Sequence, residues 1–206
     1  MIATAMDKTR FDLTLMRLHP RTMPAALERV RRWLEGRPGQ LIACLYSDIG
    51  TVNQLLLLRR FADAADLLAE RDAALRERDP FGVSEFSLGL SMDLWAALPG
   101  IPAPGQPARG PLFELRTDRL KPGRLARALA AWGRAEPGLM PAAGFFTLAA
   151  DAPQIVHLWP WSSDAGRIGP SDADSPTDIA GRLGGAENLA AQRTELFRAA
   201  AFSPLQ

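Results

Sequence analysis

The strongest constraint on the fold of this chain is that one short segment occurs twice. Residues 11–23 read Phe-Asp-Leu-Thr-Leu-Met-Arg-Leu-His-Pro-Arg-Thr-Met, and residues 113–125 read Phe-Glu-Leu-Arg-Thr-Asp-Arg-Leu-Lys-Pro-Gly-Arg-Leu. Both segments alternate apolar and polar residues, which indicates a strand, and a proline that cannot donate to a sheet then ends it. At an offset of 102, the identical residues are Phe11 and Phe113, Leu13 and Leu115, Arg17 and Arg119, Leu18 and Leu120, and Pro20 and Pro122.

The similarity between the two copies continues beyond the proline. Apolar residues recur at helical spacing over residues 23–34 and 125–132, and each stretch predicts an amphipathic helix with one face to bury. At an offset of 100, paired short apolar runs predict a hairpin in each copy, with strands at 41–47 and 54–58 and at 144–149 and 154–158.

The two copies differ after the hairpin. Residues 64–75 predict a second helix in the first copy, with Asp63 and Asp66 in its first turns. In the second copy, glycines and prolines within 163–177 interrupt any helix. We therefore expect residues 166–178 to be irregular and more mobile than 62–78, with a helix at about 185–198. Closing strands are expected at 84–92 and 199–202.

Each copy thus reads β-α-β-β-α-β, the ferredoxin-like order. We expect an α+β fold with two tandem ferredoxin-like repeats, at 10–97 and 111–206, joined by a Pro/Gly-rich linker at 98–110. A sheet with helices on one face leaves its other face bare. The two units are therefore predicted to pack sheet to sheet.

The composition excludes several classes of function. A formal net charge of +1 over 206 residues gives no electrostatic argument for binding nucleic acid or a membrane surface. The longest apolar run is far shorter than a membrane helix, and no secretory signal is recognisable at the N-terminus, so we expect a cytoplasmic protein.

The single cysteine, Cys44, lies in an apolar strand and is interpreted as a buried core residue.

Several motifs resemble the NIPSNAP family of the dimeric α+β barrel superfamily. In the second copy these motifs are Phe113-Glu-Leu-Arg-Thr with Leu120-Lys-Pro-Gly123, His157-Leu-Trp-Pro-Trp161 followed by Arg167, and Phe202-Ser-Pro-Leu205. The first copy matches more loosely, through Arg17-Leu-His-Pro20, Asn53-Gln54 and Ala97-Leu-Pro-Gly100. Members of the family usually have an aromatic residue with a hydroxyl group where this chain has Trp161. They also usually have an uninterrupted second helix where this chain has its Gly/Pro tract.

The resemblance implies a dimeric α+β barrel, here formed by the two halves of one chain. Eukaryotic members of the family are linked to mitochondrial and vesicular roles. Related barrels include cofactor-independent monooxygenases, lactone isomerases and haem enzymes. The resulting hypothesis is a cofactor-independent enzyme that acts on a small apolar, carbonyl-bearing molecule in the cavity between the sheets.

Strand alternation suggests a candidate site in the second copy. If Phe113 and Leu115 face the helices, then Glu114, Arg116 and Asp118 face the space between the sheets. The same reasoning points His157 and Trp159 into that space. His157 is a candidate general base, Arg116 a candidate anion ligand and Glu114 a candidate orienting group. Candidate substrate-binding residues are Asp118, Trp159, Trp161 and Tyr46.

A structural interpretation of these residues stays open beside the catalytic one. Glu114 and Arg116 can satisfy each other as an internal ion pair, with His157 hydrogen-bonded to one of them. The equivalent residues of the first copy are Asp12, Thr14, Leu57 and Arg59, so any site is one-sided. His19 and His157 lack the spacing of a metal site, and we expect no metal and no cofactor.

The sequence is therefore compatible with a cofactor-independent enzyme, with a barrel that binds a ligand or partner without chemistry, and with a structural pseudo-enzyme. A homo-oligomer is compatible with all three.

Overall fold

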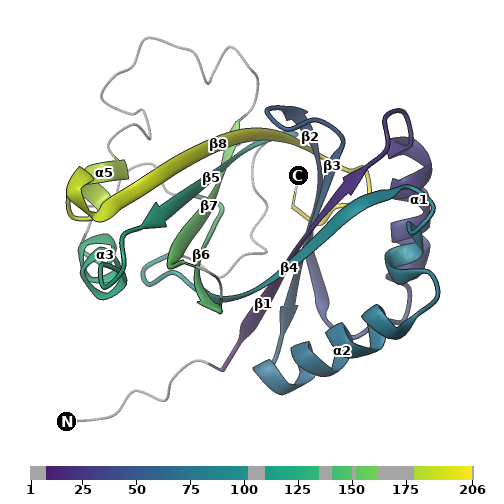
Figure 1. The fold of residues 1–206 in the computed structure, drawn as a ribbon, viewed down its shortest axis with the longest axis horizontal. Helices are drawn as coiled ribbons and strands as arrows, with labels where there is room; N and C mark the ends of the chain where they lie inside the picture. The colour runs from purple at the N-terminus through teal and green to yellow at the C-terminus, as the bar shows by residue number, and fades with distance from the viewer. Residues whose placement is uncertain (1–7, 102–109, 135–140, 150–151, 162–178, 206) are drawn as a thin grey trace.

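The computed structural model describes residues 8–101, 110–134, 141–149, 152–161 and 179–205 (Figure 1). The described strands and helices follow one another as β1 (Arg10–Leu18), α1 (Met23–Trp33), β2 (Gln40–Ile49), β3 (Gln54–Phe61), α2 (Ala64–Arg76), η1 (Pro80–Gly82), β4 (Ser87–Ala97), β5 (Leu112–Leu120), α3 (Leu125–Trp132), β6 (Ala143–Ala149), β7 (Gln154–Trp161), α5 (Ile179–Arg182), η3 (Ala186–Asn188) and β8 (Leu189–Ala199). The predicted α+β class is confirmed.

The strands form a closed antiparallel barrel in the order β1-β3-β2-β8-β5-β7-β6-β4. Strands β1–β4 of the N-terminal half are neighbours in the order β4-β1-β3-β2, and β5–β8 of the C-terminal half are neighbours in the order β8-β5-β7-β6. Two seams join the halves, β2 with β8 and β4 with β6. In Figure 1, α1 and α2 cover the outside of one half, and α3 and α5 lie outside the other.

Backbone hydrogen bonds recur in the two halves at the offsets of the sequence repeat. Leu18 and Leu120 donate at 2.8 Å to the carbonyls of Asn53 and Pro153 respectively. The N–H groups of Gln54 and Gln154 each donate at 2.9 Å to a hydroxyl of the preceding strand, Ser47 and Thr147 respectively. Across the seams, the amide of Leu98 donates to Gly144 and that of Ala200 to Cys44, both at 2.9 Å.

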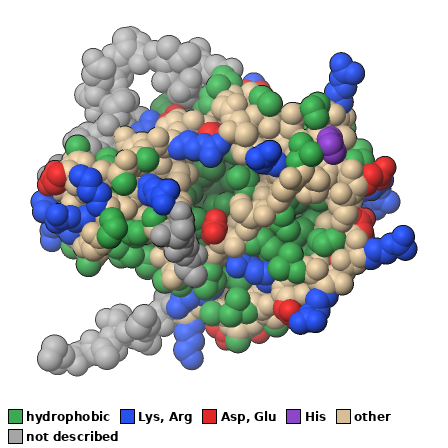
Figure 2. All heavy atoms as spheres, viewed as in Figure 1, with side chains coloured by type: hydrophobic (Ala, Val, Ile, Leu, Met, Phe, Trp, Pro, Cys, Tyr) green, Lys and Arg blue, Asp and Glu red, His purple; other side chains and the backbone are tan. Residues whose placement is uncertain are grey.

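The barrel interior is an apolar core to which both halves contribute. Its buried residues are Phe11, Leu13, Ile42, Ala43, Leu45, Leu56, Leu58, Trp95, Phe113, Leu115, Ala143, Phe145, Val156, Leu158, Phe197 and Leu205. The rings of Phe11 and Phe145 lie 4.7 Å apart and so link the two halves directly. Figure 2 shows hydrophobic side chains in the middle of the face in view, between the two halves. The described core residues therefore fill the space between the sheets with side chains.

Two further apolar layers lie outside the barrel, between its strands and the helices. In the N-terminal half, Met16, Leu55 and Leu57 pack against Ala26 and Val30 of α1. In the C-terminal half, the layer consists of Leu98, Leu120, Ala128, Trp132, Ile155, Trp159 and Leu183. One face of each strand thus points into the barrel and the other toward the helix layer.

The prediction of a helix at 185–198 is wrong, because strand β8 occupies Leu189–Ala199. Its Ala, Glu, Gln and Arg residues favour a helix locally, but pairing with β5 along the whole strand outweighs that preference. Similarly, β4 runs to Ala97, beyond the predicted end at residue 92. The irregular segment expected at 166–178 lies outside the described residues, as does most of the linker. None of the described helices is long and apolar enough to cross a membrane.

Candidate functional site

The predicted cluster of the C-terminal half lies outside the barrel, which corrects the expected facing of β5 and β7. Phe113, Leu115, Val156 and Leu158 form part of the barrel interior. His157 is fully buried on the opposite face, and its ring centre lies 5.3 Å from that of Trp132 in α3. The alternation was identified correctly but was assigned to the wrong sides, because the inter-sheet space was assumed to be polar. A closed barrel instead selects the uniformly apolar face.

His157 is held by hydrogen bonds at both ring nitrogens. Its Nε2 lies 2.8 Å from Oδ2 of Asp118, and Nε1 of Trp159 donates to its Nδ1 at 2.5 Å. Gln192 donates at 2.8 Å to the other oxygen of Asp118. Because an indole nitrogen can only donate, Nδ1 is the acceptor and Nε2 carries the proton. This hydrogen-bond pattern is that of a neutral, fully satisfied imidazole.

Burial lowers the pKa of His157 below its usual value of 6.5, although the contact with Asp118 opposes that shift. The imidazole is protonated more readily in the unfolded chain, so unfolding takes up a proton at mildly acidic pH. We expect the free energy of unfolding to be constant above the unfolded pKa and to decrease as the pH falls below it. His157→Gln should flatten this dependence relative to the wild type in urea denaturation at pH 7.5 and 5.5. The control is His19→Gln at an exposed position, and equal slopes for all three proteins would contradict the assignment.

The other candidates of the C-terminal half divide into two groups. Arg116 forms the predicted ion pair with Glu114, whose side chain is only 2% exposed. Arg116 is paired in register with His157, and Glu114 with Trp159, so the two contacts lie on adjacent strands of one face. Trp161 is at the end of β7, and its Nε1 is buried without a hydrogen bond among the described residues.

Tyr46 belongs to a different region, because it lies on β2 and is paired in register with Arg198 across the seam. The structure therefore groups the predicted site residues Asp118, His157 and Trp159 and does not bring Tyr46 to them.

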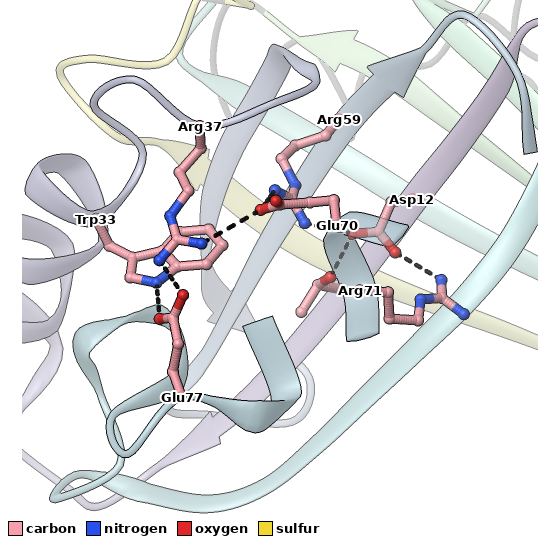
Figure 3. A network of polar contacts seen from close by, with 8 residues as sticks. Asp12, Trp33, Arg37, Arg59, Glu70, Arg71 and Glu77 are labelled. Atoms are coloured by element: carbon pink, nitrogen blue, oxygen red, sulfur yellow. Dashed lines mark hydrogen bonds and ion pairs between the residues drawn. The ribbon is translucent and has the colours of Figure 1, made fainter. Parts of the chain in front are cut away.

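A network of buried charges in the N-terminal half was not predicted as a site (Figure 3). Arg59 of β3 has a side chain only 1% exposed and donates to Oε1 of Glu70 at 3.0 Å and to Oδ2 of Asp12 at 3.1 Å. Arg71 donates to Oδ1 of Asp12 at 2.6 Å. Asp12 and Arg59 occupy the positions equivalent to Glu114 and Trp159, so both halves place polar groups in the same layer.

Aromatic rings and a second arginine complete this network. The Arg59 guanidinium lies 5.3 Å from the ring centres of both Trp33 and Phe61. Arg37 lies 4.3 Å over the ring of Trp33 and forms an ion pair with Glu77, which also accepts a hydrogen bond from Trp33 at 2.8 Å. Arg37 also comes within 3.9 Å of Glu70, and thus connects the deeper charges to the partly exposed ones.

One signal in the sequence could have revealed this network. Arg59 directly follows the apolar run Leu55–Leu58 on a face that must be buried, and a buried charge requires a partner. Glu70 follows Leu67 by three residues, so it lies on the inward face of α2. That pairing spans two elements, and the repeat could not show it because the second copy has no equivalent arginine.

A groove of about 640 Å³ lies beside the network, between α2 and the adjoining ends of β2 and β3. It is lined by Pro38, Gly39, Gln40, Arg60, Phe61, Ala62, Asp66, Ala69, Glu70 and Ala73. The backbone of Gly39 has a φ of +87°, and a Cβ there would lie 2.5 Å from the Phe61 ring, so only glycine lets this ring lie against the turn. The described residues contain no group of three or more potential metal ligands.

Solved structures with the same fold cover nearly the whole chain. An anthrone oxidase-like protein aligns over 95% of this chain and 92% of its own, with a TM-score of 0.67 and 15% identity. A protein provisionally named a monooxygenase, from Lactobacillus acidophilus NCFM, aligns over 93% and 94%, with a TM-score of 0.55 and 8% identity. At these identities the similarity establishes the fold alone. No curated protein matches the chain.

A family model and a shorter solved structure each match about half of the chain or less. A NIPSNAP-like domain protein from Burkholderia xenovorans aligns over 47% of this chain and 91% of its own, with 19% identity and a TM-score of 0.41. The family model for NIPSNAP matches residues 11–86, whereas the motifs that suggested the resemblance lie mainly in the C-terminal half. The similarity to this family therefore rests on residues 11–86.

Proposed function

We propose that this chain is an α+β barrel protein that binds a small amphipathic molecule in the groove between α2 and the ends of β2 and β3. The observation that carries the proposal is the position of Glu70, a buried carboxylate that lines a groove of about 640 Å³. Ligand sites are usually concave, largely apolar and furnished with a few fixed polar groups, and the groove has a volume typical of them.

The network beside the groove supports this assignment. Buried charges are costly unless they are paired, and replacing them with apolar residues is often neutral or stabilising. Arg59 holds Oε1 of Glu70, and within the described part of the chain no hydrogen bond reaches Oε2. Oε2 would offer a ligand in the groove a hydrogen-bond acceptor whose orientation is already fixed. The Glu70 side chain would therefore lose little conformational entropy on binding.

The lining of the groove defines the class of ligand. Phe61, Ala69 and Ala73 offer an apolar surface with room above the small side chains, while Asp66 and Glu70 offer acceptors. A flat aromatic molecule that carries hydroxyl groups matches both features, because its rings can lie over the exposed Ala69 and Ala73 and its hydroxyls can donate to the carboxylates. The name of the anthrone oxidase-like neighbour supports an aromatic ligand of this class.

The fold that supports the groove is, in this proposal, a tandem pair of ferredoxin-like repeats that forms a dimeric α+β barrel within one chain. The support is the recurrence of strand order, of hairpin hydrogen bonds and of seam contacts at offsets of 102 and 100. The proposed repeats are 10–97 and 111–206, with 98–110 as the linker.

Filling the groove tests the proposal. We expect Ala69→Leu to weaken binding of a dihydroxyanthrone at least tenfold, because the added side chain would occupy the groove between Ala69 and Ala73. The measurement is quenching of tryptophan fluorescence during a titration. Ala65→Leu on the same helix is a matched control, since Ala65 is exposed and outside the groove. Equal affinities for the two variants would overturn the groove as the binding site.

A second candidate function is cofactor-independent catalysis in the C-terminal half, with His157 as the base, Arg116 and Glu114 beside it, and Trp159 as a substrate contact. The observation that favours it is the His157–Asp118 contact of 2.8 Å in an apolar layer. Proton abstraction would require Trp159 to release Nδ1. Oxygen consumption with anthrone should then be lost in His157→Gln while binding persists. Activity that survives this substitution would eliminate the candidate.

A further inference from the structure

Strand β4 has an edge that is only partly used. It pairs with β1 along nearly its whole length, from Ser87 to Trp95. On its other side, pairing with β6 is confined to Leu94–Ala97. Residues 87–92 therefore present an edge to which no other described strand is hydrogen-bonded. In Figure 1 this part of β4 runs toward α1, away from the C-terminal half.

The exposed edge lacks two of the features that usually prevent association, charged residues and prolines, although the strand has a β-bulge at its start, between Ser87 and Gly89. Its sequence, Ser-Leu-Gly-Leu-Ser-Met, contains no charged residue and no proline. Leu88 and Leu90 are 51% and 38% exposed and lie on the same face of the strand. Natural proteins usually protect such edges with charges, prolines or short strands, and an unprotected apolar edge is a template for adding a strand.

Strand β8 offers an internal comparison, because it occupies the equivalent place in the C-terminal half. It pairs with β5 throughout but with β2 only over Leu196–Ala199. Its open stretch carries Gln192 and Arg193, and the Arg193 side chain is 53% exposed. Both strands have a β-bulge at their start, so the charged residue is what distinguishes the β8 edge from the uncharged β4 edge.

We propose that residues 87–91 of β4 pair antiparallel with the same residues of a second copy of this chain across a twofold axis. A register centred on Gly89 places Leu88 of one subunit opposite Leu90 of the partner subunit, so both exposed leucines become cross-strand pairs. Such an isologous contact uses one surface twice and closes as a dimer. Because this edge has no charge, two copies meet without repulsion, and both unpaired edges are satisfied at once.

A designed disulfide tests the pairing directly. Gly89→Cys is tolerated by the fold, since a Cβ there has no neighbour within 4 Å. The native Cys44 will not interfere, because it is buried and burial raises its pKa to about 12. Antiparallel partners in this register lie within the distance that a disulfide spans. We expect oxidation to convert most of the variant to a covalent dimer, whereas Leu75→Cys, exposed on α2, should remain a monomer on denaturing gels.

The noncovalent dimer gives a second test. By sedimentation, we expect the wild-type chain to dimerise in the micromolar range. Leu88→Lys with Leu90→Lys should weaken dimerisation at least tenfold, while Leu75→Lys should leave it unchanged. A wild-type chain that stays monomeric well above that range, or a Gly89→Cys variant that crosslinks no faster than Leu75→Cys, would overturn the proposal. Neither outcome depends on ligand binding in the groove.

Discussion

Arg59→Met should destabilise the protein by about 3–5 kcal/mol, the usual cost of breaking a buried ion pair by removing one partner. The substitution leaves the carboxylates of Asp12 and Glu70, which are 1% and 3% exposed, without their shared cation. Methionine preserves most of the apolar volume between Trp33 and Phe61, so the loss would report on charge more than on packing. Urea denaturation near neutral pH measures the effect.

An exposed ion pair provides the matched control for this variant. Arg31 contacts Glu28 at 3.0 Å, with a side chain that is 47% exposed, and Arg31→Met should leave the stability nearly unchanged, because solvent screens this pair. A loss below about 1 kcal/mol for Arg59→Met as well would mean that the network is not held together by its charges, and the rigid orientation of Glu70 would lose its basis.

Phe145→Ala should cost about 3–5 kcal/mol and should destabilise both halves together. Phe145 is fully buried in the barrel interior, where its ring meets that of Phe11 from the other half. Since the halves share this core and two strand seams, we expect one cooperative unfolding transition in both the wild type and the variant. Leu148→Ala, at a position 45% exposed in the same strand, should change the stability by less than about 1 kcal/mol.

Two separate transitions, one insensitive to Phe145→Ala, would show that the halves fold as independent domains. Hydrogen exchange followed by residue would detect that case, because amides of β1 and β3 would keep their protection while those of β6 and β7 lost it.

The sequence was most informative where the signal was local. The alternation in residues 11–18 and 113–120, together with the proline after each, predicted β1 and β5 and the helices that come after them. It failed where tertiary pairing decides the conformation. The Ala- and Glu-rich stretch of β8 favours a helix on its own, and only the strands beside it make it extended.

The candidate site was predictable as a set of residues but not in its environment. Strand spacing grouped Asp118, His157 and Trp159 on one face, and the structure places them in contact. Alternation along a strand separates its residues into two faces, but it does not show which face lines the barrel interior and which faces the helices. Arg59 and Glu70 were not recognised as a pair, because their contact joins a strand to a helix and has no counterpart in the second copy.

The most direct test of the proposed function is to map by NMR the backbone amides that shift when a dihydroxyanthrone is titrated into the protein. Binding in the groove predicts that the largest changes fall on Gly39, Phe61, Ala69 and Glu70, and that Ala69→Leu abolishes them while Ala65→Leu preserves them. Changes confined to the layer around Trp132, His157 and Trp159, with the groove amides unmoved, would contradict the proposal and place the ligand in the C-terminal half.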